Sequence, residues 1–274
     1  MSFIEDVRWF TAAPVTDTPD GPAPPGRVTL VGAGPGDPEL LTLRAVKALR
    51  GARLVLYDNL VGKEVLRYVA EDADLIYVGK EASRHTLPQE SIIDLMVRLA
   101  RSGRSLVRLK GGDGFIFGRG GEEVLALAEA GIAFEVVPGI TAAQGAGACA
   151  GIPLTHRDHA ATLVFATGHL RGDNELALDW EALARPRQTV VIYMGVGNLP
   201  TICGELVRHG LPAQTPAALV EQASLPGQRC ITGTLQDLPQ LAQQHRVRPP
   251  ALIVVGEVVA LQPQLMRGMQ ATVL

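Results

Sequence analysis

The stretch RLKGGDGFIFGRGGEE, residues 108–123, combines several glycines with a single aspartate, Asp113. Its first three glycines lack side chains that would keep a ligand away from the main-chain N–H and C=O groups: Gly111, Gly112 and Gly114. A planar or anionic molecule can therefore lie directly on the chain. Glu122 and Glu123 follow in a predicted first helical turn, whose dipole favours negative charge. The stretch predicts a strand that ends at Lys110, then a binding loop, then a helix.

Two other patterns suggest chemistry but lack essential residues. The turn GAGPGD at residues 32–37 invites comparison with the dinucleotide fingerprint GxGxxG. Its third glycine falls on Asp37, and Pro35 removes a donor N–H, so an NAD site is disfavoured. The phosphate-binding pattern GxxxxGK[ST] occurs nowhere. His156 and His159 have no third ligand beside them, so ordinary loop histidines are favoured over a metal pair.

Five apolar runs alternate with helical segments between Arg27 and Val137, a pattern typical of a parallel sheet covered on both faces. The predicted strands are RVTLVG, RLVLY, DLIYVG, SLVRL and AFEVV. Helices are predicted over residues 38–49, around Glu64, over residues 89–101 and directly after the glycine-rich stretch. Pro138-Gly139 then forms a natural break.

A second alternation follows Gly139. It starts with the small-residue helix TAAQGAGACAG and continues with the strands TLVFAT, TVVIYM, PAALV, RCITGT and PALIVVG, with helices near Ile202 and Leu238. Some of these strands are spaced closely enough to be antiparallel neighbours, so we expect a mixed sheet. The predicted fold is α/β with two domains: a flexible Pro-rich tether at 1–26, domains at 27–138 and 139–262, and a tail at 263–274.

Composition excludes several classes of protein. The 274 residues are 47% hydrophobic, and the net charge of −3 equals the acidic surplus of residues 1–26. The neutral remainder has no basic run, which argues against a nucleic-acid partner. Three scattered cysteines form neither a disulfide framework nor a zinc spacing, so a reducing cytoplasm is expected. No apolar run reaches 18 residues and the N-terminus is acidic, which argues against membrane spanning and secretion.

Motifs that follow one another along most of the chain carry a resemblance. They are VTLVGAGPGDPELLTLRA, YDNLV, VGKEASRHTLPQESI, VRLKGGDGFIFGRGGEE, VPGITAAQGAGACAGIPLTHR, ATGHL, IYMGV and PALIVVGEVV. From about Arg27 to Leu261 the chain resembles the tetrapyrrole methyltransferase family. That resemblance implies a two-domain homodimer with S-adenosylmethionine in the cleft between the domains, and no metal.

The resemblance also implies a set of cofactor contacts: Pro35, Gly111, Gly112, Asp113, Ile116, Thr141, Ala142, Met194 and Ala223. The residue types suit the task, since bare backbone meets the ligand and Asp113 accepts from hydroxyl or ammonium groups. Met194 offers soft apolar contact, with an ordinary core methionine as its alternative. Gly114 departs from the family, which usually has proline there, so the loop is expected to be looser. Ala223 replaces a glycine of close relatives.

The resemblance assigns proton chemistry to two residues. Asp58, just past the strand RLVLY, is implied as the general base, and Lys80 as a proton donor or substrate contact. The alternatives are an N-cap or turn aspartate and a solvated lysine. The implied substrate, uroporphyrinogen III, carries eight carboxylates, so cations are expected around the cleft. The candidates are Arg84, Lys110, Arg119 and Arg157, each with surface solvation as its alternative.

The implied reaction transfers two methyl groups from S-adenosylmethionine to ring carbons 2 and 7, giving precorrin-2 for sirohaem or cobalamin synthesis. Three alternatives stay open: methylation of a later precorrin such as precorrin-4, a silent S-adenosylmethionine sensor, and a fused sirohaem synthase with dehydrogenase and chelatase activities. Only 26 residues precede the motifs, so we expect the reaction to stop at precorrin-2.

Overall fold

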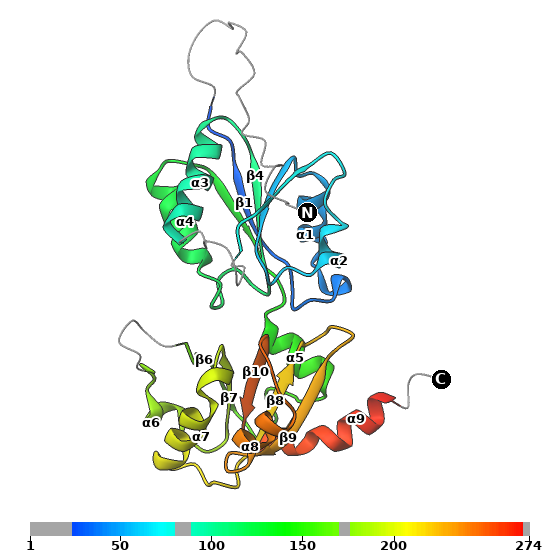
Figure 1. The fold of residues 1–274 in the computed structure, drawn as a ribbon, viewed down its shortest axis with the longest axis vertical. Helices are drawn as coiled ribbons and strands as arrows, with labels where there is room; N and C mark the ends of the chain where they lie inside the picture. Colours follow the sequence, from blue (N-terminus) through cyan, green and yellow to red (C-terminus); the bar gives the residue numbers. More distant parts are fainter. Residues whose placement is uncertain (1–23, 80–88, 170–175, 271–274) are drawn as a thin grey trace, which may run out of the picture.

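The computed structural model describes residues 24–79, 89–169 and 176–270, so most of the predicted tether lies outside it. Two five-stranded sheets form two lobes, one above the other in Figure 1. The first sheet has the order β3-β2-β4-β1-β5 with parallel pairing throughout. Its strands are β1 (Val28–Gly32), β2 (Leu54–Tyr57), β3 (Asp74–Tyr77), β4 (Leu106–Lys110) and β5 (Phe134–Val137). All five agree with the predicted strands.

Helices cover both faces of the first sheet, because its strands are apolar on both sides. Val31, Val55 and Val107 pack with α1 (Leu43–Arg50) and α2 (Lys63–Leu66). Leu54 and Leu106, on the opposite face, pack with α3 (Gln89–Arg101) and α4 (Gly120–Glu129). A parallel sheet buried in this way needs near-continuous apolar strands, and the sequence supplies them.

The helix predicted over residues 38–49 is wrong at its start. Residues Pro38–Leu40 form a separate 3-10 turn, capped by Asp37, whose Oδ1 accepts the Glu39 N–H at 2.9 Å. The chain is then extended, and α1 begins only after Thr42, whose hydroxyl accepts the Ala45 N–H at 3.1 Å. Two capping residues in succession split what the sequence suggested was one helix.

The second sheet is mixed, as predicted, with the order β6-β7-β10-β8-β9. Only β6 and β7 pair in parallel. The strands are β6 (Thr162–Thr167), β7 (Gln188–Tyr193), β8 (Pro216–Glu221), β9 (Arg229–Thr234) and β10 (Ala251–Val255). One face packs against α6 (Trp180–Leu183), α7 (Leu199–Arg208) and α8 (Leu238–Gln244). The other packs against α5 (Ala142–Ala150) and the 3-10 segment Glu257–Leu261.

The short elements were harder to predict. The helix α6, the 3-10 segment Val196–Asn198 and the helix α9 (Gln262–Gln270) were not expected, and α9 occupies most of the predicted tail. The predicted break at Pro138-Gly139 falls between β5 and α5. The segment that connects these two elements links the lobes in Figure 1. The domain limits themselves stay a prediction. None of the helices in the described residues is long and apolar enough to cross a bilayer.

Candidate active site

The glycine loops after β1 and β4 are joined to each other at the carboxyl edge of the first sheet. The Gly112 N–H donates to Gly34 O at 2.7 Å, and the Gly34 N–H donates to Gly112 O at 3.1 Å. Gly112 has a φ of 65°, a left-handed conformation that residues with a Cβ adopt at a cost. The predicted binding loop is therefore a fixed turn rather than a slack connection.

Asp113 ties this loop to the start of the second lobe. Its Oδ1 accepts the Phe115 N–H at 2.9 Å, and its Oδ2 accepts the Gly139 N–H at 3.0 Å. A carboxylate offers about four acceptor positions, so two remain for a ligand. Asp113 is partly exposed and can supply them.

Gly114, expected to loosen the loop, is buried and held by its neighbours. Its carbonyl accepts the Gly120 N–H at 2.9 Å, and Gly118 packs against the same oxygen. A Cβ at Gly120 would lie 2.5 Å from that oxygen, so the close approach requires glycine. The close packing anchors the Gly114 backbone despite the missing proline.

The residues predicted to contact the cofactor come together from both lobes. A Cβ on Gly112 would point at the Ala142 N, 3.6 Å away, and a Cβ on Gly145 of α5 would lie 2.6 Å from the Pro35 ring. Ile116 packs, with Ala142, against the core of the second sheet. The loop after β1 and the loop after β8 also touch, because the Asp37 N–H donates to the Ser224 hydroxyl at 3.1 Å.

The second lobe contributes Thr141, Ala142, Met194 and Ala223. Thr141 is the N-cap residue of α5 and its hydroxyl lies 2.6 Å from the Tyr193 hydroxyl. Met194 follows β7 with a left-handed φ of 54° and is 52% exposed, so it is not the core methionine that was the alternative. Ala223 packs against the second sheet's core in the loop after β8.

Backbone strain is concentrated around these residues. Among the described residues, seven non-glycine positions have positive φ. Five of them border the candidate cofactor loops: Phe117, Arg119, Met194, Gln222 and Ser224. Such conformations cost about 1–3 kcal/mol each and tend to persist where a site depends on them. Their distribution therefore points to the same region as the predicted contacts.

Asp58 lies at the end of β2, beside the glycine loop. The Leu60 N–H donates to its Oδ1 at 3.2 Å, and the Arg108 guanidinium donates to its Oδ2 at 3.2 Å. Leu60 in turn lies against Gly111, where a Cβ would come within 2.7 Å of the Leu60 Cβ. The turn-aspartate alternative is thus correct in part, but the carboxylate is also paired and 23% exposed. Its free acceptor positions suit a general base.

Arg108 connects Asp58 to a network of buried charged side chains. The Arg108 side chain is 2% exposed and donates from Nε to Glu123 Oε1 at 3.2 Å. Lys110 donates to the same oxygen at 2.9 Å, and Gln89 at 3.0 Å. Glu123 is fully buried, and its Oε2 has no hydrogen-bond partner among the described residues. Burial and the nearby Arg108 lower the pKa of Lys110.

The cationic side chains predicted to bind the substrate lie in different environments. Lys80 and Arg84 lie outside the described residues. Lys110 is only 4% exposed and bound to Glu123, so its ammonium is directed into the protein rather than toward a substrate. Arg119 is 56% exposed at the start of α4, paired with Glu122. Arg157 is exposed, and its carbonyl accepts a hydrogen bond from the Arg187 side chain. Arg187 directly precedes β7, whereas Met194 directly follows it, so Arg157 lies at the other end of this strand from Met194. The structure does not bring Arg157 to the site.

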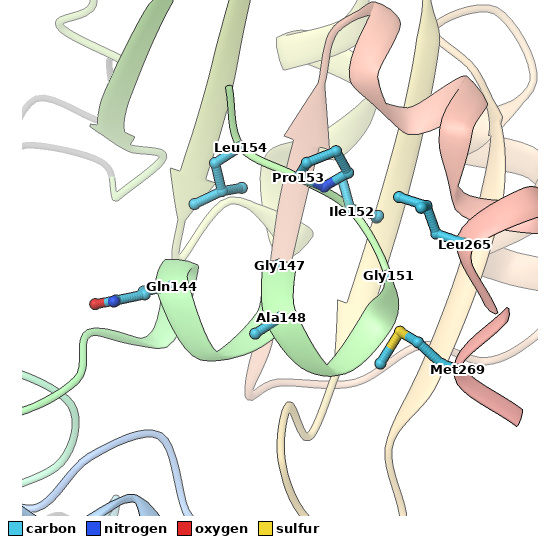
Figure 2. A pocket seen from close by; sticks show the side chains of 9 residues that line it. All are labelled: Gln144, Gly147, Ala148, Gly151, Ile152, Pro153, Leu154, Leu265 and Met269. Carbon is cyan, nitrogen blue, oxygen red and sulfur yellow. The ribbon is translucent and has the colours of Figure 1, made fainter. Parts of the chain in front are cut away.

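Outside the candidate site, the described part of the chain has a cavity but no cluster of metal ligands. Within the described residues no group of three or more His, Cys, Asp or Glu side chains could hold a metal. A cavity of about 430 Å³ lies between the C-terminal half of α5 and α9, where Figure 2 shows Leu265 and Met269 beside Gly151. It is lined by none of the predicted site residues.

Sequence reasoning missed three residues of this region: Arg108, Glu123 and Tyr193. Arg108 had a visible signal, because it is a charged residue in the middle of a central strand whose other residues, apart from the terminal Lys110, are apolar. Glu123 could not be separated from Glu122 by sequence, although only Glu123 is buried. Tyr193 looked like the apolar end of a strand, and its hydroxyl partner Thr141 is 52 residues away.

Comparison with known proteins identifies the family. The profile of Tetrapyrrole (Corrin/Porphyrin) Methylases matches residues 27–239. The chain belongs to the tetrapyrrole methylase family. The resemblance carried by the motifs is therefore confirmed, and so is the two-domain α/β fold, since solved members of this family superpose on both lobes.

Solved structures and curated relatives refine the placement within this family. The uroporphyrin III C-methyl transferase of Thermus thermophilus is 44% identical, with a TM-score of 0.75 over 86% of this chain and 100% of that one. It has also been solved complexed with S-adenyl homocysteine. A cobalt precorrin-4 methyltransferase is 27% identical with the same TM-score, over 85% and 95% of the two chains.

The curated relatives are longer than this chain. The siroheme synthase of Nitrosomonas europaea is 57% identical over 242 residues, which cover 88% of this chain and 51% of that protein. The chain thus spans about half the length of the curated relatives that it matches.

Proposed function

We propose that this tetrapyrrole methylase uses S-adenosylmethionine to methylate uroporphyrinogen III at ring carbons 2 and 7, giving precorrin-2 through precorrin-1. The observation that carries the proposal is the 44% identity to the Thermus uroporphyrin III C-methyl transferase over its whole length. The 27% identity to the precorrin-4 methyltransferase is lower, although the fold agrees equally well. The chain therefore stands nearer to the enzyme of the earlier substrate.

The residues at the lobe boundary fit the cofactor. Gly112 leaves the space toward Ala142 free of a side chain. Asp113, next in the chain, is partly exposed, and Met194, directly after Tyr193, is exposed, so both are open to a ligand. In our proposal the main chain of Gly111 and Gly112 and the pair Thr141-Ala142 hold the cofactor. When bound, S-adenosylmethionine supplies an electrophilic methyl group on its sulfonium.

The first lobe is proposed to hold the macrocycle and to move the proton. Two large apolar side chains next to the glycine loop are exposed, Leu60 at 63% and Phe115 at 55%, which suits the apolar face of a tetrapyrrole. Arg119 at the rim suits its carboxylates. Asp58 takes the proton from a pyrrole nitrogen, which makes the ring carbon a stronger nucleophile. Alignment of the two reactants supplies much of the remaining rate enhancement.

The test is product analysis with isotope-labelled S-adenosylmethionine and reduced uroporphyrinogen III. We expect two labelled methyl groups on each macrocycle, and ring positions 2 and 7 by NMR. Transfer to a precorrin-4-type substrate alone would replace this proposal with the later methylation. Binding of S-adenosylhomocysteine without transfer to either tetrapyrrole would instead favour a sensor.

The additional activities of a sirohaem synthase are not part of this proposal. With NAD and ferrous iron added to the labelled reaction, we expect precorrin-2 to accumulate, and formation of sirohydrochlorin would contradict this. We also propose a cytoplasmic homodimer. Light scattering would then report twice the mass of the chain, and a monomer would contradict it.

A further inference from the structure

Tyr193, the last residue of β7, reaches the start of α5 with its hydroxyl. That hydroxyl accepts the Ala143 N–H at 3.0 Å and lies 2.6 Å from Thr141 Oγ1. Tyr193 is 8% exposed, so both contacts are shielded from water. Burial also raises the pKa of Tyr193, which keeps its hydroxyl protonated and able to donate.

The hydroxyl of Tyr193 does what an N-cap side chain ordinarily does. Thr141 has the extended backbone of an N-cap residue, with φ −68° and ψ 152°, but its own hydroxyl makes no cap hydrogen bond. An N-cap oxygen usually accepts the N–H of the second or third helical residue. Here Ala143, the second residue, donates to Tyr193 instead. When Tyr193 donates to Thr141, the threonine proton remains free for a ligand.

The tyrosine ring connects this helix start to the first lobe. Phe117, from the loop after β4, has its ring centroid 4.8 Å from that of Tyr193 at an interplanar angle of 51°. Phe165 of β6 lies on Tyr193 as well, at 5.9 Å and 64°. Aromatic pairs with such tilted geometry are favourable beyond their buried area. The ring is thus held by both lobes while its hydroxyl holds Thr141 and Ala143.

We propose that Tyr193 is a positioning residue that fixes the Thr141-Ala142 end of the cofactor site and couples it to the glycine loop through Phe117. The inference rests on the proposed function, because it assumes that S-adenosylmethionine binds beside Thr141 and Ala142. In this proposal Tyr193 acts through Thr141 and Ala143 and does not itself touch the reacting atoms. Its effect is therefore on cofactor affinity rather than on tetrapyrrole affinity.

The test is the variant Tyr193→Phe, which keeps the ring and removes the hydroxyl. Calorimetric titration with S-adenosylhomocysteine is expected to show a Kd raised about tenfold, because one buried N–H loses its acceptor and Thr141 loses its partner. The KM for S-adenosylmethionine should rise by a similar factor while the KM for uroporphyrinogen III stays within about twofold. Tyr68→Phe removes a hydroxyl from a partly buried tyrosine that packs against the first lobe's core, and it should leave both constants unchanged.

A merely structural role makes a different prediction. If Tyr193→Phe lowers the Tm but leaves the Kd of S-adenosylhomocysteine unchanged, the inference is overturned. Failure of wild-type protein to bind S-adenosylhomocysteine would instead overturn the proposed function. Thr141→Ser, which retains a hydroxyl, should keep the affinity, and Thr141→Val should lose it.

Thr141→Val alone, which removes the same contact from the other side, covers the case in which Tyr193→Phe folds poorly. A double-mutant cycle tests the coupling where both variants fold. Thr141→Val and Tyr193→Phe should be strongly non-additive in cofactor affinity, because each removes the same 2.6 Å contact. Additive effects would mean that the two hydroxyls act independently, and would contradict the coupling.

Discussion

The two edges that meet at the candidate active site are held by different forces. In the first lobe, Asp58, Arg108 and Glu123 form a chain of charges, and Arg108 and Glu123 are almost fully buried. In the second lobe, neutral groups do the equivalent work, with the Tyr193 and Thr141 hydroxyls at the start of a helix of small residues. Ion pairs orient a carboxylate firmly, whereas small neutral residues let a ligand approach the backbone. The difference matches the proposed division between proton transfer and cofactor binding.

The largest effect should come from Asp58→Asn, which removes the proposed general base from the first lobe. We expect kcat to fall by about 100- to 10,000-fold, the usual contribution of a general base. The Kd for S-adenosylhomocysteine should stay near wild type, because the second lobe is unchanged. Asp94→Asn, on the exposed side of α3, is the matched control. Unchanged turnover in Asp58→Asn would remove the proton-transfer role from the first lobe.

Glu123→Gln tests whether the buried charges depend on one another. It leaves the Arg108 and Lys110 cations without their shared carboxylate, so the free energy of unfolding should fall by about 3 kcal/mol. Glu129→Gln makes the same change at an exposed position of the same helix and should alter stability little. Urea unfolding of both variants measures the difference. Equal values would mean that the network contributes nothing specific.

Gly112→Ala tests the bare backbone between the lobes. The φ of 65° should cost about 1–2 kcal/mol of stability with a side chain present. The added methyl group would also enter the space toward Ala142, so the affinity for S-adenosylhomocysteine should fall about tenfold. Gly121→Ala, inside α4 with nothing near its Cβ, should be neutral or stabilising. If the two variants bind equally well, Gly112 is not part of the cofactor site.

The smallest effect concerns the cysteine thiols of the second lobe. Burial raises the pKa of Cys203 to about 12 and that of Cys230 to about 11, so both remain protonated near neutral pH. Iodoacetamide should therefore label them slowly in the native protein and rapidly after unfolding, at about pH 8. Mass spectrometry follows the labelling at each site. Rapid native labelling of Cys203 would show that the second lobe opens more readily than its packing indicates.

The sequence was sufficient for the repetitive part of the fold. Strands such as β2 and β4 are short apolar runs between helical segments, and that pattern is typical of buried parallel strands. The start of α1 was not predictable from periodicity, because Asp37 and Thr42 cap two different elements within six residues. The mixed second sheet followed from strand spacing, whereas its strand order required the structure.

The candidate site could be predicted where a residue belongs to a local motif, and not where its role depends on a distant partner. The glycine loop and Asp113 are recognisable within one short segment. The contact of Arg108 with Asp58, 50 residues away, forms only because β2 and β4 pair, so it could not be predicted from the sequence around either residue. Lys110 illustrates the reverse case, since its charge suggested a substrate contact but its ammonium donates to the buried Glu123.

A crystal structure with S-adenosylhomocysteine bound would test the central claim, that the two lobes share one methyl-donor site. We predict that the ligand contacts Gly111–Asp113 from the first lobe and Thr141, Ala142 and Met194 from the second, with Asp58 facing the sulfur across open space. A ligand bound instead in the cavity between α5 and α9, or touching only one lobe, would contradict the account.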